Sequence, residues 1–467
     1  MNLVYGVKDR PKFGKLIVFA LQQVLAILAA TIAVPSIIGH DMSQSAALFG
    51  AGVGTIVYLL FTKFKSPVFL GSSFAFIGSM FAAFAGAASA QAGYAGLIIG
   101  AVCAGLVYVI IAVVVKFAGV KWIDKLMPAV VIGPTVSIIG LSLAGNAVGD
   151  LFNGKVGFIT EKIVTIAGEE VAALSDHNFF VSTANQYVAI ICGLITLFTV
   201  ILCSVYGKKM MKLIPFIIGI VAGYIAAAIF TVIGIMTGNV SLQLIDFSAF
   251  SGMKIFAVPD FTFLTAFKGL KEITPSFIAT VAVAYVPVAF VVFAEHIADH
   301  KNLSTVIGSE LLEDPGLHRT LLGDGVGSMA GAFFGGCPNT TYGESVGCVA
   351  ITGNASVLTI LVTAGLAILI SFFGPFVTFL SSIPNCVMGG VCITLYGFIA
   401  VSGLKMIQKV DLNENRNLFV VAVILICGIG GLILKFGNIE LTEVAVALIL
   451  GIIVNLITPN KAAKESK

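Results

Sequence analysis

Charged side chains are scarce in this chain. Only 10% of its 467 residues are Asp, Glu, Lys or Arg, whereas 58% are hydrophobic and the mean hydropathy is +1.07. Soluble globular domains carry about 25% charged residues, so the composition excludes that class. The net charge of +3 is small and the chain has no basic run, which argues against a nucleic-acid partner. The sequence predicts an all-α polytopic membrane protein.

Catalytic signatures are nearly absent as well. The chain has no Walker loop, which argues against ATP as the direct energy source, and no His-Glu-x-x-His zinc motif. Residues 343–347 match Gly-x-Ser-x-Gly, but a serine hydrolase needs a later histidine and none follows Ser345. We interpret this match as chance and expect neither an enzyme nor a cofactor. The eight cysteines show no metal spacing and are expected to be small core residues.

Apolar segments fill most of the chain. A membrane-spanning helix needs about 20 apolar residues, and we count fourteen candidate segments in the sequence. Their predicted starts are near Leu16, Ala46, Val68, Ala95, Met127, Tyr187, Leu213, Phe277, Gly323, Glu344, Val357, Cys386, Leu418 and Leu441. Segments three, nine and ten are short and rich in Gly and Ser, which predicts broken helices there.

The distribution of basic residues supports this count. With the N-terminus in the cytoplasm, six Lys lie in predicted outside loops and the other 20 of the 26 Lys and Arg lie inside. Cytoplasmic loops carry such an excess of positive charge. The six outside residues are Lys155, Lys162, Lys254, Lys268, Lys271 and Lys435. We therefore predict a multi-pass protein of the cytoplasmic membrane with both termini inside and long outside loops at about 146–186 and 236–276.

Three short stretches in the first half of the chain are similar in sequence to stretches in the second half. The two members of each match lie seven segments apart. The matching stretches are 29–33 with 294–298, 70–73 with 342–345, and 128–133 with 384–389. Because seven is odd, the second half is predicted to be inverted, as in secondary transporters whose site lies between short, matching segments near the midplane. The repeat pairs Glu295 with Ala30 and Glu344 with Ser72, so each glutamate faces a small residue that leaves space for a ligand.

The densest polar stretch is 335–347. Pro338, Gly343 and Gly347 disfavour a continuous helix there. Irregular backbone at membrane depth is tolerated only where it lines a cavity or is buried in protein. Two half-helices whose N-termini meet near the midplane would offer free N–H groups to a ligand. The alternative is a tight external loop.

Glu295 lies inside the eighth apolar segment. A charge at the bilayer centre costs roughly 3 kcal/mol on insertion scales, and such residues mark substrate or ion pathways. The alternative is a structural carboxylate paired with a Lys or His. Asp299, one helical turn later, is either a coupling residue or a solvated helix cap. His296 points to another face and is expected to pack, whereas His300 and His318 are expected in loops.

Taken together, these stretches resemble the nucleobase–ascorbate transporter (nucleobase:cation symporter-2) family over essentially the whole chain. The motifs that carry the resemblance are Gln22-Gln23, Ala30-Thr-Ile-Ala-Val-Pro35, Leu70-Gly-Ser-Ser-Phe-Ala75, Ala294-Glu-His-Ile297, Asp314-Pro-Gly-Leu-His-Arg319, Pro338-Asn-Thr-Thr-Tyr-Gly-Glu344, Val387-Met-Gly-Gly390 and Leu395-Tyr-Gly397. The stretches 314–319 and 339–344 are the most specific. The family implies proton symport of a nucleobase, and it is commonly dimeric.

The resemblance also implies an architecture and a site. It implies two inverted repeats of seven segments, with a core domain (1–125 and 277–382) and a gate domain (126–276 and 383–467). Short strands in segments three and ten would meet at the substrate. Carried over by position, the substrate-binding residues are Glu295, Glu344, Phe74, Gly343, Ala30, Tyr342 and Tyr396, and the proton-coupling residues are Glu295 and Asp299.

One position departs from the best-known uracil carriers of the family. They carry a histidine four residues after the first glutamate, where this chain has Asp299. Purine carriers of the family carry Asp there but usually place Gln at the position of Glu344. Uracil is therefore the expected substrate, and a xanthine or urate symporter is the alternative. An anion transporter of the same architecture is a further alternative that two glutamates disfavour.

Overall fold

The computed structural model describes residues 3–119, 122, 128–154, 156–159, 162–166, 169–173, 179–182, 184–208, 210–436 and 439–458. The predicted start of the fifth segment at Met127 lies outside the described residues. So do the basic residues Lys121, Lys125, Lys155, Lys209, Lys461, Lys464 and Lys467.

Long apolar helices form most of the described structure, as the hydropathy predicts. Eight helices in the described ranges are long and apolar enough to cross a membrane. They are α1 (Phe13–Ile38), α2 (Gln44–Phe61), α4 (Ala90–Ala118), α6 (Ala129–Ser142) with α7 (Ala144–Leu151), α8 (Gln186–Tyr206), α10 (Pro215–Thr237), α12 (Pro275–Ile307) and α17 (Asn385–Ile407). The chain is therefore an integral membrane protein.

Shorter or less apolar helices complete the bundle. Four of them are apolar: η1 (Phe74–Phe76) with α3 (Ile77–Ala85), α15 (Val357–Ser371), α18 (Asn415–Ile429) and α19 (Glu443–Ile457). The others are α9 (Met210–Leu213), η2 (Val240–Leu242), η3 (Phe247–Phe250), α11 (Thr262–Gly269), η4 (Leu270–Glu272), η5 (Leu312–Gly316), α13 (Leu317–Gly335), α14 (Gly343–Thr352) and α16 (Gly374–Ser381).

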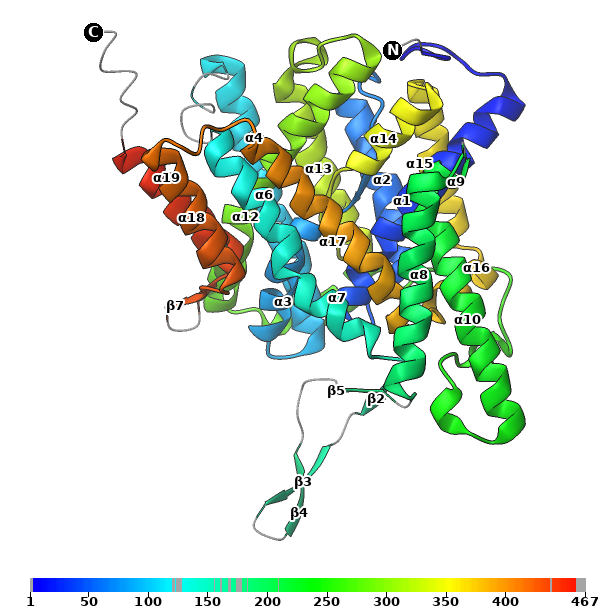
Figure 1. The fold of residues 1–467 in the computed structure, drawn as a ribbon. Helices are drawn as coiled ribbons and strands as arrows, with labels where there is room; N and C mark the ends of the chain where they lie inside the picture. Colours follow the sequence, from blue (N-terminus) through cyan, green and yellow to red (C-terminus); the bar gives the residue numbers. More distant parts are fainter. Residues whose placement is uncertain are drawn as a thin grey trace.

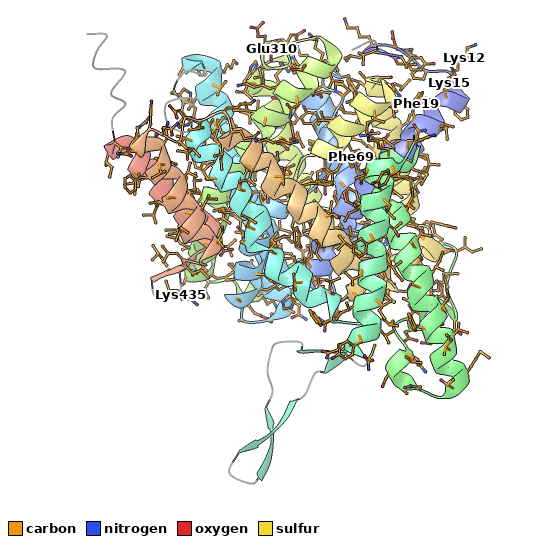
Figure 2. All side chains as sticks on the ribbon, viewed as in Figure 1. Lys12, Lys15, Phe19, Phe69, Glu310 and Lys435 are labelled. Carbon is orange, nitrogen blue, oxygen red and sulfur yellow. The ribbon has the colours of Figure 1, made fainter. Side chains whose placement is uncertain are left out.

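The start of α1 and the end of α19 lie at the same end of the bundle, the terminal end (Figure 1). Figure 2 shows Lys12, Lys15 and Glu310 at this terminal end and Lys435 at the opposite end. Three antiparallel strand pairs lie outside the bundle core: β2 (Val156–Ile159) with β5 (Phe179–Ser182), β3 (Lys162–Ile166) with β4 (Glu169–Ala173), and β7 (Leu434–Phe436) with β8 (Ile439–Leu441). These pairs lie at the end opposite the termini (Figure 1).

A fourth strand pair is buried inside the bundle. Strand β1 (Leu70–Ser72) pairs antiparallel with β6 (Asn339–Thr341), with Gly71 opposite Thr340. Every residue of both strands is buried, and a short helix follows each strand. Short strands in segments three and ten are therefore confirmed, and the alternative of an external loop at 335–347 is wrong.

Close contact between α2 and α13 holds β6 in place. A Cβ on Gly50 would lie 2.5 Å from the Gly331 carbonyl oxygen, so only glycine allows the two backbones to approach this closely. A Cβ on Gly331 would in turn collide with the Asn339 side chain. Asn339 fills this space, and its amide donates a 3.0 Å hydrogen bond to the Gly50 carbonyl. The small residues of segment nine therefore position the strand that follows it.

Four sequence predictions need correction. Segment nine is not broken, because α13 runs without interruption from Leu317 to Gly335. His300 is not in a loop: α12 continues to Ile307 and His300 is fully buried. His318 is the second residue of α13, not a loop residue. The predicted loop after residue 146 begins in α7, which is helical to Leu151.

Candidate functional site

The buried strand pair places the two membrane glutamates close together. After β6 the chain turns into α14, whose first two residues are Gly343 and Glu344. The Tyr342 hydroxyl donates a 2.7 Å hydrogen bond to the Ser72 carbonyl, which fixes the turn against β1. A helix N-terminus leaves its first backbone N–H groups free and carries a partial positive charge. Glu344 therefore lies at the start of α14, where the backbone N–H groups and the partial positive charge favour an acidic or carbonyl group.

Ser345 anchors this helix start to the first half of the chain. Its hydroxyl oxygen accepts a 2.6 Å hydrogen bond from the Gln23 side chain of α1. It also accepts a 3.0 Å bond from the backbone N–H of Phe69, which directly precedes β1. Three elements far apart in sequence are thereby held around one buried hydroxyl. The serine of the Gly-x-Ser-x-Gly match therefore has a structural role. We still interpret the match to the hydrolase motif as chance.

Glu295 enters the site from α12. It is half-buried, and no hydrogen bond or ion pair joins its carboxyl to another described residue. Asp299 and Glu344 lie within electrostatic range of it. The alternative of a structural carboxylate paired with Lys or His therefore fails for the described part of the chain, since the neighbouring His296 bonds to Asp324 instead.

Asp299 is buried, and α12 continues for about two turns beyond it, so the alternative of a solvated helix cap is wrong. Its Oδ2 atom accepts a 2.9 Å hydrogen bond from the Thr341 hydroxyl of β6. The two acidic residues of α12 therefore have different surroundings, because Glu295 faces open space and Asp299 is tied to the strand.

A cavity of about 320 Å³ lies between α12 and α17. Its walls are Glu295, Ala298, Asp299 and Asn302 of α12, Gly343 and Glu344 of α14, Phe398, Ile399, Ser402 and Met406 of α17, Val136 of α6 and Phe216 of α10. A smaller space of about 40 Å³ continues from it and shares Glu295, Gly343, Glu344 and Ile399. Ser73, Phe74, Thr340 and Tyr342 are among the other residues that line the smaller space.

Most predicted site residues meet at these two spaces. Glu295, Glu344 and Gly343 line both, Asp299 lines the larger, and Phe74 and Tyr342 line the smaller. Ala30 and Tyr396 are buried and are not among the lining residues of either space in the described structure. The Tyr396 ring packs edge-on against Phe74 with 5.8 Å between ring centroids, so it contacts the site through that phenylalanine.

A second polar network lies on the opposite side of α12, and the sequence analysis did not identify it. His296 Nδ1 lies 2.7 Å from Asp324 Oδ2, and both side chains are fully buried. His296 Nε2 lies 2.9 Å from the Thr320 hydroxyl, which donates to the Leu317 carbonyl. Because that hydroxyl has one proton, Nε2 must donate to it, and a further proton is shared between Nδ1 and Asp324.

His300 extends this network toward α2. Its Nδ1 bonds to the His296 carbonyl at 2.8 Å, so Nδ1 is the donor. Its Nε2 lies 2.6 Å from the Tyr58 hydroxyl, which in turn bonds to Ser66. The packing role predicted for His296 is confirmed. Asp324, a carboxylate within an apolar segment, was the sequence signal that could have revealed the network.

No metal centre is evident in the parts of the chain that the structure describes, where no three His, Cys, Asp or Glu side chains are grouped to hold an ion. The cysteines are free thiols, six of them buried and two half-buried, which agrees with a role as small core residues.

The fold is that of a polytopic membrane protein with an acidic cavity between its helices. The transmembrane domain of a cyanobacterium bicarbonate transporter, BicA, has a similar fold, with a TM-score of 0.63 over 96% of this chain and 100% of that one. Only 16% of the aligned residues are identical, so this likeness concerns the fold alone.

Sequence comparison gives the family. Residues 14–435 match the model of the Permease family, and the chain belongs to that family. It is 39% identical to the uracil permease of Bacillus caldolyticus over 98% of this chain and 95% of that protein. It is 36% identical to the uracil permease of Bacillus subtilis (strain 168) over 99% of this chain and 96% of that protein.

Proposed function

We propose that this chain imports uracil together with a proton across the cytoplasmic membrane. The observation that carries the proposal is the meeting of Glu295, Glu344 and the Gly343 backbone at one internal cavity. The two uracil permease relatives, which match almost end to end, favour the same substrate class. A purine symporter remains the competing assignment because of Asp299.

The chemistry of uracil suits these groups. Its ring edge alternates N–H donors and carbonyl acceptors. A carboxylate accepts from an N–H, and a protonated carboxyl also donates to a carbonyl. Glu295 and Glu344 would thus hold two positions of the ring edge, and the free N–H groups at the start of α14 would bind a carbonyl. Phe74 and Tyr342 supply the apolar surface on which the ring lies.

The grouping of carboxyls supports the proposed proton coupling. Glu295, Asp299 and Glu344 lie within electrostatic range in a cavity that contains no Lys or Arg among its lining residues. Like charges in a partly buried site favour uptake of a proton. A protonated Glu295 can donate to the substrate, so proton and uracil each favour binding of the other, as linkage requires. The acidic lining also disfavours an anionic substrate.

Alternating access would use the predicted inverted repeat. The eight long helices, the four shorter apolar ones, α13 and α14 add up to fourteen segments, which supports the predicted count. We assign residues 1–125 and 277–382 to a core domain and 126–276 and 383–467 to a gate domain. The cavity lies where α12 and α14 of the first meet α17 of the second.

Orientation and assembly complete the proposal. We place the terminal end of the bundle in the cytoplasm, because the excess of Lys and Arg predicted inside includes Lys12 and Lys15 at that end (Figure 2). We expect a homodimer, as is common in the family, with lipid and the nucleobase as the other partners and the proton as coupling ion.

Competition of labelled uracil uptake tests the substrate assignment. Cells that lack their own uracil uptake and produce this chain should accumulate labelled uracil. Unlabelled uracil should compete fully, whereas xanthine should compete weakly. Strong competition by xanthine, with uracil ineffective, would assign the chain to the purine symporters instead. Thymine tests whether the site tolerates a methyl group on the ring.

A further inference from the structure

The larger cavity extends well beyond the two glutamates. Glu295, Ala298, Asp299 and Asn302 form one stripe of α12 at the i, i+3, i+4 and i+7 spacing that places side chains on one helix face. Seven residues of helix rise about 10 Å, which is longer than a single pyrimidine ring. The stripe leads from the glutamates toward the terminal end of the bundle, where Glu310 follows α12 (Figure 2).

The wall opposite this stripe is aromatic. Phe398 of α17 and Phe216 of α10 both line the cavity, and their ring centroids are 6.0 Å apart at an interplanar angle of 75°. Phe74 and Tyr396 form a similar edge-to-face pair beside the glutamates. The bundle thus holds two aromatic pairs, one beside the glutamates and one in the wall of the larger cavity, where Phe216 lies in the first turn of α10. Aromatic rings bind the faces of nucleobases without regard to base identity.

Polar side chains also line the part of the cavity that lies beyond the two glutamates. Asn302 of α12 and Ser402 of α17 line it from opposite sides. Both residues are exposed at this part of the cavity, and neither side chain is hydrogen-bonded to another residue in the described structure. An amide side chain offers both an acceptor and donors, and an imide ring edge such as that of uracil presents the complementary N–H and C=O groups.

We propose that Asn302, Ser402, Phe216 and Phe398 form a second binding station for the nucleobase, between the two glutamates and the cytoplasm. The station contains an amide and a hydroxyl but no carboxyl, so it binds the base without a proton. A base that has left Glu295 and Glu344 pauses there before it is released. This inference rests on the proposed function and concerns the path of the same substrate.

The KM for uracil, measured separately at the outer and the cytoplasmic face of the membrane, tests this station. Uracil uptake into right-side-out membrane vesicles reports entry from outside, and uptake into inverted membrane vesicles reports entry from the cytoplasmic face. Without ion gradients, the ratio of maximum rate to KM must be equal in the two directions. Loss of a cytoplasmic station should therefore raise KM and the maximum rate together at that face.

The expected result is specific to one face. The double variant Asn302→Ala with Ser402→Ala should raise KM in inverted vesicles by about tenfold, the effect of losing roughly one or two hydrogen bonds. Its KM in right-side-out vesicles should stay within about twofold of the wild-type value. Thr305→Ala is the matched control, because Thr305 lies on α12 outside the cavity and bonds only to the Lys301 carbonyl.

Two results would overturn the inference. Unchanged KM at both faces would mean that the inner cavity does not bind the base. An equal rise at both faces would assign Asn302 and Ser402 to the main site. Failure of the proposed function is distinct, because then the wild-type protein would carry no uracil in either preparation.

Discussion

The Thr341 hydroxyl donates a 2.9 Å hydrogen bond to Asp299 Oδ2. This bond joins β6, which leads into Glu344, to α12, which carries Glu295 one turn before Asp299. The relative position of the two glutamates therefore depends on a contact between residues that lie 42 positions apart in sequence.

Replacing Thr341 by Val tests this dependence. The variant keeps the side-chain shape but removes the bond to Asp299, which contributes roughly 1 kcal/mol or more. The maximum rate of proton-driven uracil uptake should fall by about fivefold to tenfold. Thr341→Ser retains the hydroxyl and should behave like the wild type. Equal maximum rates of uptake for the Val and Ser variants would show that transport does not depend on this hydrogen bond.

Gly71 is predicted to be irreplaceable in β1. A Cβ at this position would lie 2.3 Å from the Tyr342 ring, which cannot move freely because its hydroxyl bonds to Ser72. Gly71→Ala should displace Tyr342 and raise the KM for uracil by about tenfold or more, as expected for a lost hydrogen bond and distorted site.

Gly78 supplies the matched control for that substitution. It belongs to α3, which begins shortly after β1, but its nearest neighbours would be 3.8–3.9 Å from an added Cβ. Gly78→Ala should therefore leave uptake unchanged. If both alanine variants transport normally, the close packing around β1 is not required for binding.

The buried pair of His296 and Asp324 should stabilise the protein. Asp324→Ala leaves His296 Nδ1 without a partner and opens a cavity, which should lower the free energy of unfolding by about 3 kcal/mol. Asp324→Asn keeps a group that can donate to Nδ1 and should cost clearly less. Thermal unfolding of the purified protein in detergent measures both. A Tm equal to the wild type for the alanine variant would contradict this account.

The ion pair of Lys65 and Asp314 should contribute little. Its atoms are only 2.6 Å apart, but the two side chains are 39% and 68% exposed. Exposed pairs contribute about 0–1 kcal/mol because water and salt screen them. Lys65→Gln should therefore shift the Tm by no more than a degree or two in the same assay, and its uptake should equal that of the wild type. A large loss of stability would mean that this contact holds the fold together.

Much of the architecture could be predicted from composition and spacing. The long apolar runs indicated membrane helices, and the Gly- and Pro-rich stretch before Glu344 indicated a broken segment. The strand there was expected only from the family resemblance. Segment nine was misjudged because its glycines resemble those of a broken helix. They are explained by close packing of α13 on α2, where a Cβ on Gly50 would collide with the Gly331 carbonyl, and such tertiary contacts are not visible in sequence.

The site was predictable only in part. Glu295 and Glu344 stood out because carboxylates are rare in apolar segments. Ser345 did not, because its role depends on partners at Gln23 and Phe69 that lie hundreds of residues away. His300 was misplaced because charged residues at 299–301 suggested that the helix had reached water. In the structure α12 continues for two further turns, and His300 faces Tyr58 in the interior.

Proton-driven accumulation by the reconstituted protein tests the central role of Glu295 most directly. Liposomes with an inward-directed pH gradient should let the wild type concentrate labelled uracil above the outside level. Glu295→Gln keeps the size of the side chain but cannot lose or gain the proton, so we predict no accumulation above equilibrium. Accumulation by Glu295→Gln at the wild-type level would contradict the assignment of Glu295 to substrate and proton binding.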